Sequence, residues 1–314
     1  MDKSTVKYIL KRMTMAFFTL LVIILVLFAM LKLMPGSPFN PEKLSPDIIA
    51  QLEAKYGLDK PVFEQFFNYL KGMITGDFGI SLVISKNSPV FDLVAPRIGV
   101  SFGIGIAAAI IGAFIGILLG IGAALNKNTI WDTIATMISV IGVSIPSFVF
   151  ALLLLIIFGV KIPIFPILYD PYDPIYSAIL PTLALSVSAI ANVARFTRSE
   201  MIEVMKSDYV LLAEAKGLDR KTLIMKHALR NTLVPVITVL APIIINLMTG
   251  SMVIEKICSI PGLGSLLVEG IQGNDYYVVM AVAFLYSLLY IVMMLVVDVL
   301  YGIIDPRIRV GKAD

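Results

Sequence analysis

The sequence has few charged side chains, a single cysteine and a single histidine. Asp, Glu, Lys and Arg make up 15% of its 314 residues, whereas hydrophobic residues make up 58%. A soluble domain carries about 25% charged residues, because its surface must be largely polar. With so few charges and a mean hydropathy of +0.92, this chain is predicted to be an integral membrane protein in a lipid bilayer. The net charge of +3 is too small to indicate a nucleic-acid partner.

The groups that catalysis requires are also missing. Cys258 has no second cysteine for an internal disulfide, and His227 lies in a charged block without the partners of nucleophilic or metal chemistry. The chain has no G-x-x-x-x-G-K-[ST] phosphate loop, so it cannot hydrolyse ATP in the P-loop way. We therefore predict that this chain is not an enzyme and has no catalytic residue, metal site or cofactor. Uphill transport would need energy from another subunit.

Long hydrophobic runs, by contrast, are abundant. A membrane-spanning helix needs about 20 largely apolar residues, and such runs occur at 13–34, 98–125, 131–160, 177–194, 231–254 and 277–302. Their length favours helices over the alternating strands of about ten residues that build a barrel. The sequence predicts an all-α integral membrane protein with six transmembrane helices. The first run is too long for a signal peptide, so we expect it to be retained.

The placement of Lys and Arg predicts the orientation. Four of them precede the first run and eight lie in 195–230. The segment 35–97 is basic too, but a segment of that length translocates largely regardless of its charge. Both termini and the loop 195–230 are therefore predicted to be cytoplasmic, an N-in/C-in topology.

The segment 35–97 is predicted to be a small helical extracellular insertion. Ser45, Pro46 and Gly57 are typical of the start and end of one short helix. In a second helix, four residues have the spacing of a buried stripe, namely Phe63, Phe66, Phe67 and Leu70. The insertion could be a lid on the membrane surface or a docking site for an external partner. The predicted divisions are 1–34 (N-terminus and first span), the insertion 35–97 and a core domain 98–314.

The spans contain two kinds of distinctive residue. In the second run, small residues recur every four positions and favour close helix packing: Ala108, Gly112, Gly116, Gly120 and Ala124. Polar residues beside prolines are candidates for lining a pathway, namely Ser144 and Ser147 around Pro146, and Thr238, Asn246 and Thr249 near Pro235 and Pro242. Hydrogen bonding between helices is the alternative for the fifth-span residues. No acidic or basic residue lies near the centre of a span, which argues against an ion-coupled carrier.

The most distinctive segment is the polar block 207–231 between two hydrophobic runs. We predict a helix from Asp208 to Lys216 that ends at Gly217, and a second helix that is capped by Asp219 and leads into the fifth span. Small residues at the centre of the block suit close seating on a partner protein. The candidate contact residues are Leu211, Leu212, Ala213, Glu214, Ala215, Lys216, Gly217, Leu218 and Asp219. The alternative is an amphipathic helix pair on anionic lipid.

This block resembles the EAA-type coupling loop of ABC importer permeases. Its residue pattern is similar to the version of this motif in the peptide/nickel permease family, and in particular in the first, B-type subunit. The family pattern is matched by Ala213, Ala215, Lys216, Gly217, Leu218, His227, Ala228, Leu229, Arg230, Asn231 and Pro235. Further resemblance lies in KLMPGSPF (32–39), GDFGISL (76–82), LPTLALS (180–186), RFTRSEM (195–201), DYV (208–210), GSMVIEKICSIPGLG (250–264) and DPRIR (305–309). The chain departs from the pattern at Leu211, Leu212 and Glu214, which concerns the polar details of docking.

The resemblance implies an ATP-driven importer in the cell membrane. This chain would be a multi-pass permease subunit forming half of the pathway. Its partners would be a homologous second permease, two ATPase subunits that bind ATP and Mg, and an extracellular substrate-binding lipoprotein. The helix 208–217 would sit in a cleft of an ATPase subunit. LMPGSPF is closest to the oligopeptide branch, although dipeptide and nickel or metal-chelate permeases share these motifs. A secondary carrier and a scaffold without transport are the alternatives from other classes.

Overall fold

The computed structural model describes residues 3–33, 59–248 and 252–304, together with 47, 50, 51, 54 and 57. Nearly all regular structure in this part of the chain is helical, apart from one isolated bridge between Ile80 and Pro89. The chain forms two compact units. The first unit comprises Met1–Ser101 and Pro261–Val299, and the second unit comprises Phe102–Ile260 and Leu300–Asp314.

Within the residues that the structure describes, five helical stretches are long and apolar enough to cross a membrane. They are Leu10–Met30, Val90–Leu125, Ile179–Val204, Arg220–Ile257 and Tyr276–Val297. A sixth span arises if Ile130–Ser144 and Ser147–Lys161, which meet at a bend of 103°, count as one. The prediction of an all-α membrane protein is thus confirmed, with six spans when the bent pair counts as one, and the N-in/C-in orientation stays a prediction.

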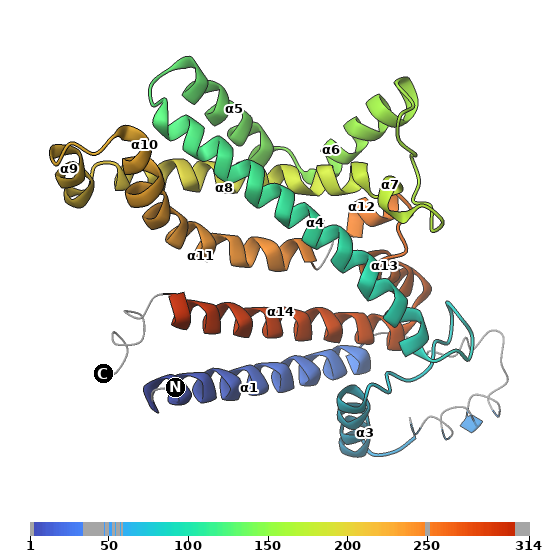
Figure 1. Ribbon diagram of the computed structural model, residues 1–314. Helices are drawn as coiled ribbons and strands as arrows, with labels where there is room; N and C mark the ends of the chain where they lie inside the picture. The colour runs from blue at the N-terminus through green and yellow to red at the C-terminus, as the bar shows by residue number, and fades with distance from the viewer. Residues whose placement is uncertain are drawn as a thin grey trace. The chain divides into compact units, whose positions relative to one another are not determined.

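The first unit packs around a core that is shared by its helices. They are α1 (Lys3–Leu33), α3 (Val62–Thr75), the start of α4 (Val90–Leu125), α13 (Leu263–Gly273) and α14 (Tyr276–Ile304) (Figure 1). The buried core side chains are Ile24, Met73, Phe78, Val90, Val94, Leu263, Leu266, Val278, Ala281, Val282 and Phe284. Residues from the predicted insertion therefore share one core with α1 and α14.

The helix α3 corrects one expectation about the insertion. Phe66 is packed as expected, with its ring against Phe28 of α1, but Phe63 and Phe67 stay 74% and 50% exposed. The inward stripe runs through Phe66, Leu70 and the buried Met73, three or four residues apart, so the packed face is rotated about the helix axis from the one predicted. The earlier predicted helix starts at Ser45 and Pro46, which lie outside the described residues.

A buried carboxylate fixes the segment that follows α3. Asp275, just before α14, is fully buried and accepts hydrogen bonds from the Ser81 hydroxyl at 2.6 Å and from the backbone N–H groups of Val83 and Ile84. These bonds tie the segment GDFGISL (76–82) and the residues after it to α14. This part of the insertion is therefore folded, as the sequence indicated.

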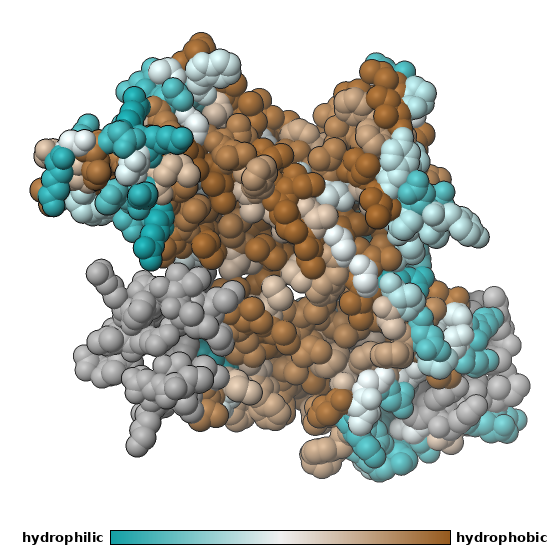
Figure 2. Space-filling view, viewed as in Figure 1, coloured by the Kyte–Doolittle hydropathy of each residue, from teal (hydrophilic) through white to brown (hydrophobic). Residues whose placement is uncertain are grey.

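The second unit is arranged around α8 (Ile179–Val204). This helix contacts α5 (Ile130–Ser144), α6 (Ser147–Leu154) and α11 (Leu229–Met248) (Figure 1). The remaining elements are α7 (Pro174–Ser177), α9 (Asp208–Ala215), α10 (Arg220–Thr222), α12 (Met252–Ile257) and two π-helical segments, η1 (Leu155–Lys161) and η2 (Leu223–Ala228). In Figure 2, hydrophilic side chains of this unit gather at α9 and α10, beside the hydrophobic helix faces.

The end of α8 differs from its prediction. The hydrophobic run ends at 194, but the helix continues to Val204. The extra residues include Arg195 and Arg198, which have good helix propensity although they are charged. A hydropathy pattern identifies only the apolar part of a helix. It therefore did not predict the polar end of α8, residues 195–204, which leads to α9.

The column of small residues in α4 packs against α8. A Cβ atom placed on Gly112 would lie 2.5 Å from the Ala189 Cβ, and one on Gly116 would lie 2.7 Å from the Val193 Cβ. A Cβ on Gly120 would lie 2.6 Å from the Ala194 carbonyl oxygen. The predicted role of this column in close helix packing is confirmed.

Candidate functional site

The candidate coupling site is the polar block, and its first helix is α9. It begins at Asp208 and ends at Ala215. Gly217 then takes a left-handed conformation with φ of +81°, and its N–H donates to the Glu214 carbonyl at 2.9 Å. Glycine adopts this conformation without the penalty that a Cβ brings. The predicted end of the helix at Gly217 is thus confirmed.

The second helix begins with the predicted cap. The Asp219 carboxylate accepts a hydrogen bond from the backbone N–H of Thr222 at 3.1 Å. Hydrogen bonds from Thr222, first from its side chain and then from its backbone, lower the pKa of Asp219 below its usual 3.8. The capping carboxylate is therefore ionised at neutral pH. Its contribution to stability is present above the unfolded pKa and is lost as the pH falls through the lower folded pKa.

The helix after this cap is not a uniform α-helix. It passes from α10 through the π-helical η2 into α11. A π-helical turn widens the hydrogen-bonding register, and such turns are frequent at functional sites. The connection to the fifth span predicted from the sequence is therefore present, with a wider turn at Leu223–Ala228.

The block has one buried face and one exposed face. Val210, Ala213 and Leu223 are buried together and pack on Val204 and Met205, the end of α8 and the residue after it. The rest of the candidate set is exposed, namely Leu211, Leu212, Glu214, Ala215, Lys216, Gly217, Leu218 and Asp219. Leu211 and Leu212 are 51% and 57% exposed, which makes them the largest apolar side chains available to a partner on α9 after the tyrosine at 209.

The pathway candidates lie in two places. Ser144 is exposed at the end of α5 and Ser147 is half-buried at the start of α6, on either side of the 103° bend at Pro146. Thr238 and Asn246 are exposed on α11 and share one face of it, eight residues apart. Thr249 lies outside the described residues. The structure thus brings Thr238 and Asn246 to one face and leaves the two serines on other helices, beside the bend at Pro146.

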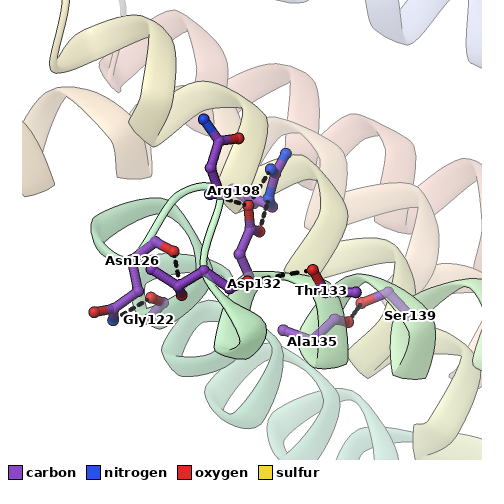
Figure 3. Close-up of polar contacts among 9 residues, drawn as sticks. Gly122, Asn126, Asp132, Thr133, Ala135, Ser139 and Arg198 are labelled. Carbon is purple, nitrogen blue, oxygen red and sulfur yellow. Dashed lines mark hydrogen bonds and ion pairs between the residues drawn. The ribbon is translucent and has the colours of Figure 1, made fainter.

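Sequence reasoning missed an ion pair between α5 and α8 (Figure 3). Arg198 Nε lies 2.5 Å from Asp132 Oδ1 and Arg198 Nη2 lies 2.7 Å from Asp132 Oδ2. Asp132 Oδ2 also accepts a hydrogen bond from the backbone N–H of Asn128 at 2.9 Å. The available signal was that both charges stand at ends of hydrophobic runs, but they are 66 residues apart, so spacing alone could not pair them.

The described part of the chain contains no cluster of three or more His, Cys, Asp or Glu side chains that could hold a metal ion. The second unit is thus a set of apolar helices joined to a polar, partly exposed block that consists of α9 and the capped α10.

Family models cover most of the chain. Residues 116–310 match the family described as the binding-protein-dependent transport system inner membrane component, and residues 5–105 match the N-terminal part of such membrane components. The fold and the match together define a multi-pass inner membrane protein of a transport system, a subunit that is not itself catalytic. The chain belongs to this family of inner membrane components. Such a component works with an ATPase and a binding protein.

Curated relatives extend the match to nearly the full length. The chain is 45% identical over 304 residues to the dipeptide transport system permease protein DppB of Lactococcus lactis, covering 97% of this chain and 99% of the relative. It is 42% identical over 304 residues to the oligopeptide transport system permease protein OppB of Escherichia coli, covering 96% and 99%.

A solved structure shares the fold. It is the crystal structure of an amino acid ABC transporter with histidines, which matches with a TM-score of 0.54 at 14% identity and covers 67% of this chain and 94% of that chain. At this identity the likeness concerns the fold alone.

Proposed function

We propose that this chain is a permease subunit of an ATP-driven peptide importer and forms half of its translocation pathway. The observation that carries the proposal is near full-length identity of 45% and 42% to permeases named for dipeptide and oligopeptide transport. The other half of the pathway is a homologous second permease. Two ATPase subunits supply the energy, and an extracellular lipoprotein delivers the peptide.

The exposed part of the polar block is the site at which an ATPase subunit acts. The small residues Ala215 and Gly217 allow close approach, and Leu211 and Leu212 present apolar contacts. ATP-driven closure of the two ATPase subunits displaces α9. The ATPases thereby shift the balance between inward-facing and outward-facing states, because their contacts differ in the two states.

Oligopeptides are the cargo favoured by the motif LMPGSPF, which lies at 33–39. Dipeptides are the second candidate, since the identity to DppB of Lactococcus lactis and of Bacillus subtilis is 45% and 44%, slightly above that to OppB of Escherichia coli. Ser144, Ser147, Thr238, Asn246 and Thr249 remain the proposed pathway-lining residues.

Purification from the native membrane tests the assembly. A tagged chain should retain a second permease and ATPase subunits after solubilisation in a mild detergent. A tagged, unrelated six-span protein from the same membrane serves as the control for adventitious capture. Recovery of the chain without any ATPase subunit would contradict the proposed function.

Uptake measurements test the cargo. A deletion strain carrying this chain on a plasmid should accumulate labelled peptides, and a strain carrying the empty plasmid should not. Dialanine, trialanine, pentaalanine and nickel are compared in competition. Preference for trialanine and pentaalanine supports the oligopeptide proposal, preference for dialanine supports the second candidate, and uptake of nickel alone overturns both.

A further inference from the structure

The ion pair of Asp132 and Arg198 has no part in the coupling site as described so far. Its two parallel contacts make it a bidentate guanidinium–carboxylate pair. The side chains are only 7% and 30% exposed. The carboxylate is the more enclosed of the two, so removing Arg198 leaves a largely buried charge without its partner, and the pair therefore constrains the helices that carry it.

The carboxylate of Asp132 joins three parts of the second unit. Asp132 lies in the first turn of α5, Arg198 lies on α8, and Asn128 lies in the turn between α4 and α5. Asn128 has a positive φ of 62°, a conformation that asparagine tolerates better than most residues. One side chain therefore holds the start of α5 to the turn before it and to α8 (Figure 3).

The helix α8 contacts α9 at the same end that carries Arg198. Val204 and Met205 pack against the buried side of the polar block, which comprises Val210, Ala213 and Leu223. Arg198 lies six residues before the end of α8, about 9 Å along a helix that rises 1.5 Å per residue. A displacement of α9 therefore reaches the ion pair through less than two turns of helix.

The helix α5 leads from the ion pair to the bend at Pro146. Along the way it contacts α8 closely through small residues, since a Cβ on Gly142 would lie 2.8 Å from the Ala191 Cβ. Small residues let the backbones of the two helices approach closely. A bidentate pair fixes the position of one helix along the other, because both nitrogen–oxygen contacts must be kept together.

We propose that Asp132 and Arg198 are positioning residues that transmit a displacement of α9 through α8 to α5, and thereby to the bend between α5 and α6. The pair makes the start of α5 and the end of α8 move together when an ATPase subunit acts on α9. This inference rests on the proposed function. It assigns a role in transport to residues outside the exposed coupling surface.

The test measures peptide transported per ATP hydrolysed by the assembled importer in proteoliposomes, with labelled trialanine and with dialanine as probes. Asp132→Asn removes the charge and Arg198→Lys keeps the charge but loses the planar fork. In both, ATP hydrolysis should stay within about twofold of the unmodified importer, while transport per ATP falls about five- to tenfold, which corresponds to a coupling free energy of about 1–1.4 kcal/mol. The double variant Asp132→Arg with Arg198→Asp should recover part of the loss.

A matched control uses an ion pair that the proposal does not involve. Lys60 and Glu64 form a pair at 2.6 Å on the insertion, with side chains 45% and 50% exposed. Glu64→Gln should leave transport per ATP unchanged, because exposed pairs contribute little. An effect of Glu64→Gln equal to that of Asp132→Asn would overturn the proposal, since loss of any ion pair would then suffice.

Two further outcomes overturn the inference. Unchanged transport per ATP in Asp132→Asn and Arg198→Lys means that the pair does not transmit movement. Failure of both variants to assemble with the ATPase subunits means that the pair serves folding alone. A failure of the proposed function is distinguished from these results, because the unmodified importer would then transport neither peptide.

Discussion

Substitutions at Gly217 can test whether a partner protein packs closely against the polar block. Its φ of +81° penalises every residue with a Cβ, by about 1–2 kcal/mol. Within the chain there is open space, because a Cβ at this position would meet no atom within 4 Å. Gly217→Ala and Gly217→Trp should therefore have a similar cost in backbone conformational energy. They differ in the volume of the side chain that projects away from the chain.

This pair of variants yields a prediction about coupling. If an ATPase subunit seats closely on the block, Gly217→Trp should abolish peptide uptake while ATP hydrolysis continues, and Gly217→Ala should retain most uptake. The comparison is made by uptake of labelled trialanine and by phosphate release in the same vesicles. Equal uptake by the two variants would show that nothing packs closely against Gly217.

Residues whose role is local were predictable from the sequence. Gly217 and Asp219 act on backbone groups within three or four positions, so their types and spacing identify them. Asp132 and Arg198 act on each other across 66 positions, and their pairing depends on how α5 and α8 pack. Such a pair becomes visible only once the helices are placed.

At the scale of elements, α4 and α8 provide a prediction about packing. A methyl group at Gly116 would lie 2.9 Å from the Ile190 carbonyl oxygen and 2.7 Å from the Val193 Cβ, whereas one at Gly122 on the same helix would meet no atom within 4 Å. Gly116→Ala should therefore destabilise the protein by about 1–3 kcal/mol, the usual effect of overpacking.

Gly122→Ala is the matched control for this prediction. It should be neutral or slightly stabilising, since alanine has the higher helix propensity. Thermal unfolding of the two purified variants in detergent, followed by loss of the monodisperse peak, measures the difference. Equal melting temperatures would mean that α4 does not pack on α8 as described.

The elements also show where hydropathy stops being informative. It predicted every span, because length and apolar content are what a bilayer requires. It missed the polar end of α8 up to Val204, and it placed the buried stripe of α3 on Phe63 and Phe67, which are exposed. The first error concerns the polar end of a span and the second concerns a helix of the insertion, outside the spans. In both places apolar character alone does not identify which face of a helix is packed.

At the scale of the whole molecule, the predicted orientation can be tested by labelling introduced cysteines, because the chain has only one cysteine of its own. Cys258 is the only cysteine and is 1% exposed. Burial raises the pKa of its thiol to about 11, so little thiolate is available at pH 7.5. The unmodified chain should therefore react slowly with maleimides, which makes it a low background for introduced cysteines.

Two exposed lysines on opposite sides of the predicted topology are suitable positions. Lys86 lies in the predicted extracellular insertion and Lys216 in the predicted cytoplasmic loop. In spheroplasts, a maleimide that cannot cross the membrane should label Lys86→Cys at once and Lys216→Cys only after permeabilisation. The reverse pattern would place the polar block outside. An ATPase that needs cytoplasmic ATP could then not reach α9, so the same measurement decides both the N-in/C-in orientation and the side on which a coupling partner must bind.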